Sequence, residues 1–297
     1  MSFIIANKKS RNQGTPIAII KGGEENGKYV FMKEKKYKIS DLPKSFVSRL
    51  QKDAIEILEE SLETGIEPKE PYTELYYESL EVFEKQRLRG FILKSGKLLP
   101  LPNFNKHECL YITGASGSGK SYFSSNFIKE YLKHYKNEEN DFVLVSGVDE
   151  DDALDKLEPN RISPEELVEK PLEANEVQDN IILFDDVLSH PNRLVKMTAI
   201  GTINHLIEVG RHTKSTIMVI SHLINNGFES RKIINESTSL TFFPKTSAKH
   251  NIRTYLERYE GLPKLIIRKI MNLPTRAVTI YRGHPSYVLY DKGVFML

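Results

Sequence analysis

The chain has 297 residues, with 39% hydrophobic and 28% charged side chains, and its 42 basic and 40 acidic residues give a formal net charge of only +2. This balance excludes collagen-like, mucin-like and disordered proteins and leaves room for one or two folded domains, while the near-neutral total argues at first sight against a nucleic-acid partner. Cys109 is the single cysteine, the first residues lack the apolar run of a signal peptide, and no segment is apolar for long enough to span a bilayer, so we expect a soluble protein in a reducing compartment.

The first hundred residues predict a small β element followed by helices. Two β-rich runs within 15–39, IAII and YVFM, flank a turn that contains glycine and asparagine and predict a hairpin. Apolar residues at helical spacing predict one helix over 40–62 and another over 72–88. The segment 98–104 contains two prolines and reads as a connector. We therefore expect an N-terminal α+β domain at 1–105 and a second domain at 106–297.

Strands and helices alternate in the second part. Strands are expected at 107–113, 141–147, 180–186, 215–222 and 237–243, with helices at about 120–135 and 191–209 and an acidic, partly helical region after the second strand. Two more helices, at 247–259 and 262–271, precede a closing hairpin. Alternation of this kind predicts an α/β fold with a mainly parallel sheet built from crossover units.

A glycine-rich loop lies between the first of these strands and its helix. Residues 114–121, GASGSGKS, fit the pattern G-x-x-x-x-G-K-[ST] of a phosphate-binding loop, although a Gly/Ser-rich linker is the structural alternative. We expect Lys120 to reach the β- and γ-phosphates of a nucleotide and the Ser121 hydroxyl to ligate Mg²⁺. The expected nucleotide-binding residues are Gly114, Ala115, Ser116, Gly117, Ser118, Gly119, Lys120, Ser121 and Tyr122.

Two aspartates end the third strand. Asp185 and Asp186 follow the apolar run IILF and resemble a Walker B strand, which would place them beside the phosphates at the sheet edge. We expect Asp185 to hold Mg²⁺ through water and Asp186 to polarise the attacking water as a general base. Paired acids are typical of additional-strand, hydrolysing ATPases, most of which carry a glutamate at the second position. A loop or helix cap is the alternative.

The next strand ends in the polar pair Ser221-His222, where such ATPases keep a sensor of the γ-phosphate, although polar strand ends are common in any α/β sheet. Arg211 is expected on the loop before this strand. There it is placed to reach a neighbouring subunit as a finger that stabilises charge on the γ-phosphate. A favourable charge at a helix C-terminus is the other interpretation of this arginine.

The order GASGSGKS, IILFDD, GRHTKSTIMVISH resembles the FtsK–HerA group of P-loop ATPases, and most closely the poxvirus-type genome-packaging ATPases of nucleocytoplasmic large DNA viruses. The resemblance covers about 107–245. It implies a RecA-like ATPase core, ATP and Mg²⁺ as cofactors, Lys120, Asp185 and Asp186 in catalysis, Arg211 as the finger in trans, and His222 at the sensor position, where relatives usually have glutamine.

The same resemblance implies a motor that pushes double-stranded DNA into a preformed capsid, acting as a ring of five or six copies. Capsid or portal vertex proteins would be its partners, and it would work at a viral assembly site in the host cytoplasm or in association with the virion. A helicase of the same superfamily, a nucleotide-dependent assembly scaffold with little hydrolysis, and a small-molecule kinase are the alternatives. The paired acids and the lack of an evident arginine-rich lid count against the kinase.

The distribution of charge permits a DNA partner where the total does not suggest one. Residues 1–50 sum to +7, 51–90 to −6, 137–186 to −14 and 187–297 to +10. Basic residues of the C-terminal region could follow DNA phosphates without reading sequence, whereas charge runs are otherwise ordinary solvated surface.

Overall fold

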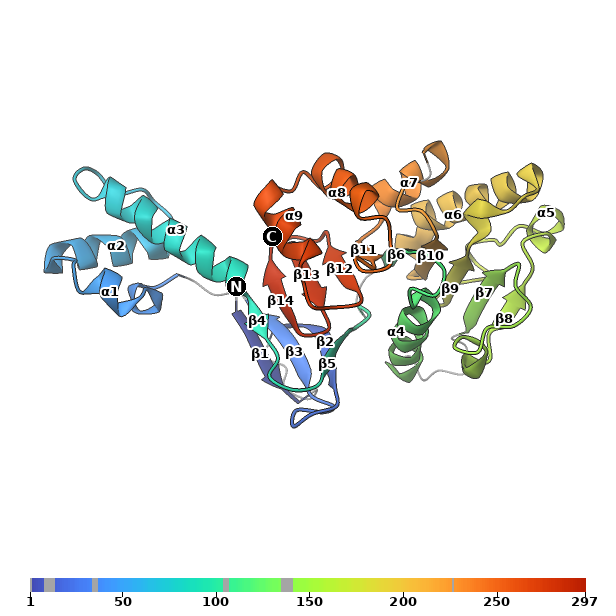
Figure 1. Cartoon of the computed structure of the whole chain (residues 1–297), viewed down its shortest axis with the longest axis horizontal. Helices are drawn as coiled ribbons and strands as arrows, with labels where there is room; N and C mark the ends of the chain where they lie inside the picture. Colours follow the sequence, from blue (N-terminus) through green and yellow to red (C-terminus); the bar gives the residue numbers. More distant parts are fainter. Residues whose placement is uncertain (1, 8–13, 34–36, 104–106, 135–140, 226) are drawn as a thin grey trace.

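The computed structural model describes residues 2–7, 14–33, 37–103, 107–134, 141–225 and 227–297. These residues form a four-stranded sheet in the order β1-β3-β2-β5 and a ten-stranded sheet in the order β4-β14-β13-β12-β11-β6-β10-β9-β7-β8 (Figure 1). The strands are β1 (Ser2–Ala6), β2 (Thr15–Lys21), β3 (Tyr29–Lys33), β4 (Phe91–Ile92), β5 (Lys97–Pro100), β6 (Glu108–Thr113), β7 (Phe142–Ser146), β8 (Asn160–Ile162), β9 (Ile181–Asp185), β10 (Thr216–Ser221), β11 (Ser239–Phe242), β12 (Val278–Tyr281), β13 (Tyr287–Tyr290) and β14 (Gly293–Met296). The α-helices are α1 (Lys44–Val47), α2 (Lys52–Thr64), α3 (Thr73–Arg89), α4 (Lys120–His134), α5 (Glu166–Glu169), α6 (Arg193–Thr213), α7 (Phe228–Glu236), α8 (Lys249–Arg258) and α9 (Lys264–Met271), with short 3-10 turns at Ile39–Asp41, Asp155–Leu157 and Val187–Ser189.

The small sheet contains the expected hairpin, because β2 and β3 pair antiparallel. The segment 98–104 is not simply a connector: β5 pairs with β2, with Leu98 opposite Ile20. Leu98 is buried against Ile17, Ile20 and Val30, so its apolar side chain is what binds this segment to the sheet. The two prolines argued against a strand in this segment. A short edge strand can nevertheless carry a proline at its end.

The expected helix over 40–62 is broken into two. A short α1 ends at Val47, and α2 starts afresh after Gln51, whose backbone is extended (φ −77°, ψ 161°). The second expected helix is confirmed as α3. Leu58 and Phe83 are buried between these helices, which extend away from the sheets as an arm (Figure 1).

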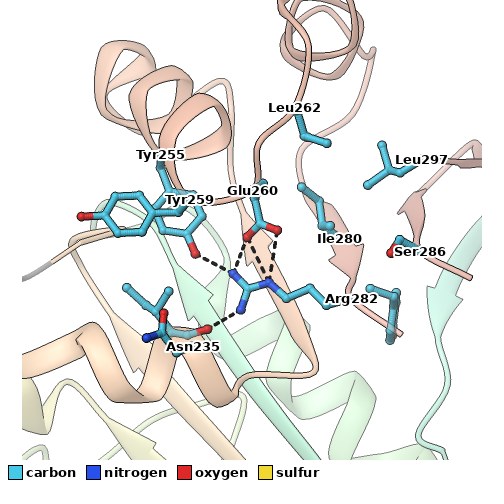
Figure 2. A pocket seen from close by; sticks show the side chains of 11 residues that line it. Asn235, Tyr255, Tyr259, Glu260, Leu262, Ile280, Arg282, Ser286 and Leu297 are labelled. Atoms are coloured by element: carbon cyan, nitrogen blue, oxygen red, sulfur yellow. Dashed lines mark hydrogen bonds and ion pairs between the residues drawn. The ribbon is translucent and has the colours of Figure 1, made fainter. Parts of the chain in front are cut away.

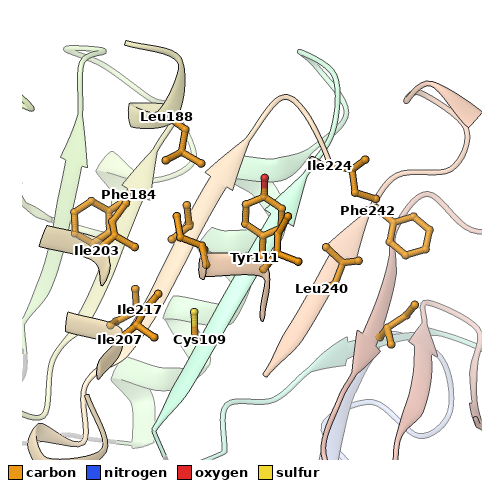
Figure 3. Close-up of a cluster of buried hydrophobic side chains, with 14 of the residues drawn as sticks. Cys109, Tyr111, Phe184, Leu188, Ile203, Ile207, Ile217, Ile224, Leu240 and Phe242 are labelled. Atoms are coloured by element: carbon orange, nitrogen blue, oxygen red, sulfur yellow. The ribbon is translucent and has the colours of Figure 1, made fainter. Parts of the chain in front are cut away.

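The large sheet is mostly parallel around β6, which confirms the α/β class. Both of its faces are covered: Cys109 and Tyr111 of β6 point into a cluster with α6 to α9, and Leu110 and Ile112 point into another with α4. Figure 3 shows the first cluster, where Phe184 and Ile217 lie beside Ile203 and Ile207 of α6. Burial on both faces explains why these strands read as continuous apolar runs.

Short strands at the ends of the large sheet were not expected. β8 arises within the acidic region, and β14 adds a third strand to the closing hairpin and pairs in turn with β4. The side chains of Arg87 and Lys269 reinforce this junction by donating to the backbone carbonyls of Leu297 and Leu88. Since β4 belongs to the first hundred residues, the two parts of the chain share one sheet. The expected boundary between 105 and 106 lies outside the described residues and stays a prediction.

Within the ranges that the structure describes, no helix is both long and apolar enough to cross a membrane.

A buried carboxyl group at the start of β6 gives a first prediction. Glu108 is 5% exposed, and its Oε2 accepts a hydrogen bond from the Asn103 amide. Burial raises the pKa of Glu108 from its ordinary value of 4.5 to about 7. The folded chain therefore holds this proton more tightly than the unfolded chain, so the stability that the protonated carboxyl contributes is present below pH 4.5 and lost as pH rises to about 7. The loss should be about 3 kcal/mol.

Replacement of Glu108 by glutamine should remove that loss, because the neutral amide keeps an acceptor for Asn103. Urea unfolding of both forms at pH 5 and pH 8 measures the difference. At pH 8 the Glu108→Gln chain should be the more stable one, by up to about 3 kcal/mol. Equal stability of the two forms at both pH values would contradict the assignment.

Candidate nucleotide-binding site

The strand order gathers the predicted motifs at one edge of the large sheet. β10 lies between β6 and β9 and is parallel to both, with Ser221 opposite Thr113 and Ile220 opposite Asp185. The loop after β6, the aspartates at the end of β9 and His222 after β10 therefore lie side by side. β10 therefore separates β6, which precedes the loop, from β9, which ends in the aspartates. The paired acids predict this order for an additional-strand ATPase.

The loop has the backbone of an anion cradle. Gly119 adopts φ +108°, which only glycine takes up readily, just before α4 begins at Lys120. A Cβ at Gly114 would lie 2.6 Å from Ser118 Oγ and 2.8 Å from the Phe243 ring, so this position also requires glycine. The positive end of α4 faces the loop, and the arrangement suits a phosphate.

Lys120 already binds within this loop. Its side chain is buried, and Nζ donates to the Gly114 carbonyl oxygen at 2.9 Å and lies 3.3 Å from Nδ1 of His222. The ammonium therefore sits where the loop and the end of β10 meet. To bind a phosphate it would exchange these neutral acceptors for anionic oxygens, which make stronger hydrogen bonds with a cation.

The two aspartates have different surroundings. Burial, aided by the charges of Asp186 and Asp151, raises the pKa of Asp185 to about 6. Ser146 Oγ, at the end of β7, lies 3.5 Å from Asp185 Oδ2. Such a carboxylate gains from a cation, because a nearby positive charge offsets the cost of its burial.

Asp186 lies in a strained turn against His222. Its φ of 52° is in the left-handed region that a non-glycine residue adopts at a cost, and such strain often accompanies functional sites. Its Oδ2 is 2.7 Å from Nε2 of His222, while Oδ1 is buried and has no hydrogen-bond partner in the described part of the chain. An unpaired buried carboxylate oxygen next to a second carboxylate is a donor set that fits Mg²⁺ or an ordered water.

His222 thus connects the two halves of the site, since one ring nitrogen faces Lys120 and the other faces Asp186. The structure brings together the loop residues, Asp185, Asp186 and His222. Tyr122 follows the loop with its side chain 67% exposed.

Arg211 lies elsewhere. It is not on a loop, because α6 continues to Thr213 and carries Arg211 in its last turn. This turn is beside His107, whose pKa is lowered mainly by burial and also by the Arg211 charge. His107 precedes β6, so Arg211 lies at the opposite sheet edge, about 20 Å from the loop at roughly 3.3 Å per strand residue. It does not reach the site of its own chain.

Arg276 contacts the phosphate-binding loop, which the sequence did not predict. It precedes β12, and its Nε and Nη2 donate to the carbonyl oxygens of Ser118 and Gly117 at 2.7 and 2.8 Å. A second cation therefore holds the loop, 158 residues further along the chain. Only folding brings the two together, and no local signal marks this arginine. Ser146 beside Asp185 was missed for the same reason.

A buried ion pair forms part of the wall of a separate cavity of about 400 Å³ (Figure 2). Arg282 Nε lies 3.0 Å from Glu260 Oε1, and its Nη1 donates to the Ile234 and Ser237 carbonyls. The two side chains are only 19% and 10% exposed. Because the guanidinium satisfies backbone carbonyls and a carboxylate, this cluster ties the end of β12 to α7 and α8.

Removal of this guanidinium should be costly. In Arg282→Met, the Glu260 carboxylate would remain buried without its counter-charge, and the free energy of unfolding should fall by about 3–5 kcal/mol. Lys85→Met is the matched control, because Lys85 and its partner Glu81 are 72% and 71% exposed, and it should cost less than about 1 kcal/mol. Chemical denaturation measures both, and equal losses would contradict the structural role of Arg282.

The chain was compared with protein families and with curated proteins. No protein-family model matches it. It is 32% identical over 204 residues to the uncharacterized protein V3 of Sputnik virophage, a match that covers 68% of this chain and 82% of that protein.

Among solved structures, it is similar to the DNA-packaging ATPase B204 of Sulfolobus turreted icosahedral virus, with a TM-score of 0.44 and 11% identity over 65% of this chain and 98% of that one. The type VII secretion ATPase EccC of Thermomonospora curvata gives 0.44 and 14%, over 69% of this chain and 28% of that one. The conjugation coupling protein TcpA of pCW3, solved with ATPγS, gives 0.39 and 10%, over 94% and 76%. Likeness at this level does not assign an activity.

Proposed function

This chain belongs to the family of the V3 protein of Sputnik virophage, and from that premise we propose that it is an ATP-hydrolysing motor that moves double-stranded viral DNA into a preformed capsid. V3 is itself uncharacterized, so the proposal rests on the site. One observation carries it: the side chains of Lys120, Asp185, Asp186 and His222 meet at one edge of the large sheet. β10 lies there between β6, which precedes the loop, and β9, which ends in the aspartates.

ATP and Mg²⁺ are the proposed cofactors. The amides of 114–121 and Lys120 would hold the phosphates, and Ser121 and Asp185 would hold Mg²⁺, which neutralises phosphate charge when bound. Asp186 would polarise the attacking water. The contact between Asp186 and His222 supports a sensor role for His222. A change at the γ-phosphate that moves His222 would also alter the surroundings of Asp186, the proposed general base.

A ring of five or six copies is proposed because Arg211 is exposed and far from the site of its own chain. A finger at this position acts only on a neighbouring copy, with Arg211 as the proposed catalytic residue in trans. Capsid or portal vertex proteins would bind the ring at the viral assembly site in the host cytoplasm or in the virion. Basic residues of 187–297 would contact DNA phosphates without sequence preference.

Within the FtsK–HerA group, the poxvirus-type packaging ATPases remain the proposed nearest relatives, and a helicase of the same group is the main alternative. Two assays on the full chain separate them. A packaging translocase should displace a third strand from triplex DNA in the presence of ATP and leave a forked duplex intact. Robust unwinding of the fork would instead favour the helicase, and neither activity together with slow hydrolysis would favour an assembly scaffold.

A further inference from the structure

A cavity of about 350 Å³ lies between the two sheets, at the edge of the large sheet opposite the phosphate-binding loop. The small sheet contributes Ile17 and Met32 to its lining, and the large sheet contributes Glu108, Tyr281 and Tyr287. We propose that this cavity binds an organic cation, namely a primary ammonium group carried on a short hydrocarbon chain or ring. None of these residues belongs to the nucleotide site, so the cavity is a second site, apart from the proposed function.

Glu108 supplies an acidic group that meets no cation of its own chain among the described residues. Its side chain is buried, and Oε2 accepts a hydrogen bond from the Asn103 amide at 2.7 Å. Within the same ranges Oε1 accepts no hydrogen bond, and it keeps some accessible surface. A buried carboxylate is costly unless a positive charge meets it, so an ammonium group that enters this cavity gains an ion pair with Glu108.

Two aromatic rings lie near this carboxyl group. Tyr281 and Tyr287 stack with their ring centroids 4.6 Å apart and an angle of 15° between the ring planes. Burial raises the pKa of both phenols, and the charge of Glu108 raises it further, which places the carboxyl close to the pair. Both phenols therefore stay neutral near pH 7. Because a cation is attracted to the electron-rich face of a tyrosine ring, the pair and the carboxyl favour the same kind of ligand.

The remaining walls suit the hydrocarbon part of such a ligand. Ile17, Met32 and Leu101 line the cavity with apolar side chains, and its volume lies within the range of small-molecule pockets. A bare metal ion would gain nothing from these walls. In the described part of the chain, moreover, no group of three or more His, Cys, Asp or Glu residues could hold one. The lining thus favours an organic ammonium ion over an inorganic cation.

Binding of the cation should release a proton from Glu108. Burial raises the pKa of this carboxyl group to about 7, so below pH 7 it is mostly protonated and has to ionise before it can pair with an ammonium group. The affinity should therefore fall about tenfold between pH 8 and pH 6. His107 and His284 also line the cavity, and burial together with the Arg211 charge lowers the pKa of His107. A variant without the Glu108 charge separates their contribution.

Calorimetric titration of the full chain with phenethylammonium and with phenethyl alcohol tests the proposal, because the two probes differ in the cationic group. At pH 8 the unaltered chain should bind the ammonium about tenfold or more tightly than the alcohol. Titrations in buffers of different ionisation enthalpy should show the release of about one proton at pH 6 and little release at pH 8. Acetyl-lysine methylamide carries the same ammonium group as a protein side chain, and the tighter of the two ammonium probes tells a partner's lysine from a free amine.

Replacement of Glu108 by glutamine should weaken phenethylammonium binding about tenfold or more at pH 8, remove its pH dependence, and leave the alcohol within about twofold. This variant should fold, because the amide keeps an acceptor for Asn103. Thr15→Trp, at an exposed position that lines the cavity, should weaken both probes by filling it. Glu257→Gln, at an exposed position on α8, is the matched control and should change neither. Thermal melting shows whether each variant is folded.

Equal affinity of the unaltered chain for the ammonium and the alcohol would overturn the cation site, and so would the binding of neither probe. Unchanged ammonium affinity in the folded Glu108→Gln chain would overturn it as well. ATP hydrolysis by the same samples reports separately on the proposed function, because Glu108 starts β6 and the phosphate-binding loop follows the other end of that strand.

Discussion

Replacement of Lys120 by alanine should lower the ATPase rate by about a hundred- to a thousandfold. The ammonium is held between the loop carbonyls and His222, at the place where a γ-phosphate would meet the loop, and it is the cation best placed to offset the charge that develops there. Steady-state phosphate release from the full chain measures the effect. A rate close to that of the unaltered chain would contradict the assignment of the loop as the catalytic phosphate site.

Lys129→Ala is the matched control for this variant, because Lys129 is an exposed lysine on the same helix α4 and should leave the rate unchanged. Lys120 also holds Gly114, so its loss could loosen the loop. Thermal melting and circular dichroism of both variants separate a chemical effect from unfolding. Lys120→Arg adds a further test, since it keeps the charge but misplaces it, and it should remain slow.

Replacement of Arg211 by alanine should reduce turnover by about three orders of magnitude and leave ATP binding almost unchanged. The side chain is exposed at the sheet edge opposite the loop, so its removal does not touch the nucleotide site of its own chain. Titration of the nucleotide and steady-state hydrolysis measure the two effects separately. If binding and hydrolysis fell together, Arg211 would not be the finger.

Mixing two inactive variants gives the decisive form of this test. In a ring that contains Arg211→Ala and Lys120→Ala chains, some intact loops would face intact arginines of their neighbours, and activity should reappear. Lys214→Ala, an exposed basic residue just after α6, is the control and should retain full activity. No recovery in mixed, co-assembled rings would contradict action in trans.

The residues that the sequence could place are those whose signals are local. The motif 114–121 joins β6 to the start of α4 as its spacing requires, and the runs that became β9 and β10 are apolar because both faces of the sheet are covered. These strands are parallel neighbours, so their polar ends had to meet at one edge. The additional-strand arrangement followed from the paired aspartates.

What the sequence could not place depends on pairing over long distances or on weak local signals. Arg276 meets the loop only because β12 lies beside β11, and nothing in its neighbours indicates a role. β5 ends in one of the two prolines that suggested a connector, and its place in the sheet depends on Leu98 meeting the β2 side chains. The break at Gln51 within 40–62 interrupts a pattern whose apolar spacing alone is compatible with one helix.

ATP hydrolysis by the full chain, measured with and without double-stranded DNA over a range of salt concentrations, tests the proposed motor most directly. Duplex DNA of any sequence should stimulate hydrolysis, and the stimulation should fall steeply as salt rises, because phosphate contacts release counterions that salt restores. Lys120→Ala should lower both the basal and the stimulated rate by about a hundred- to a thousandfold. Hydrolysis that is indifferent to DNA at every salt concentration would contradict a DNA-translocating motor.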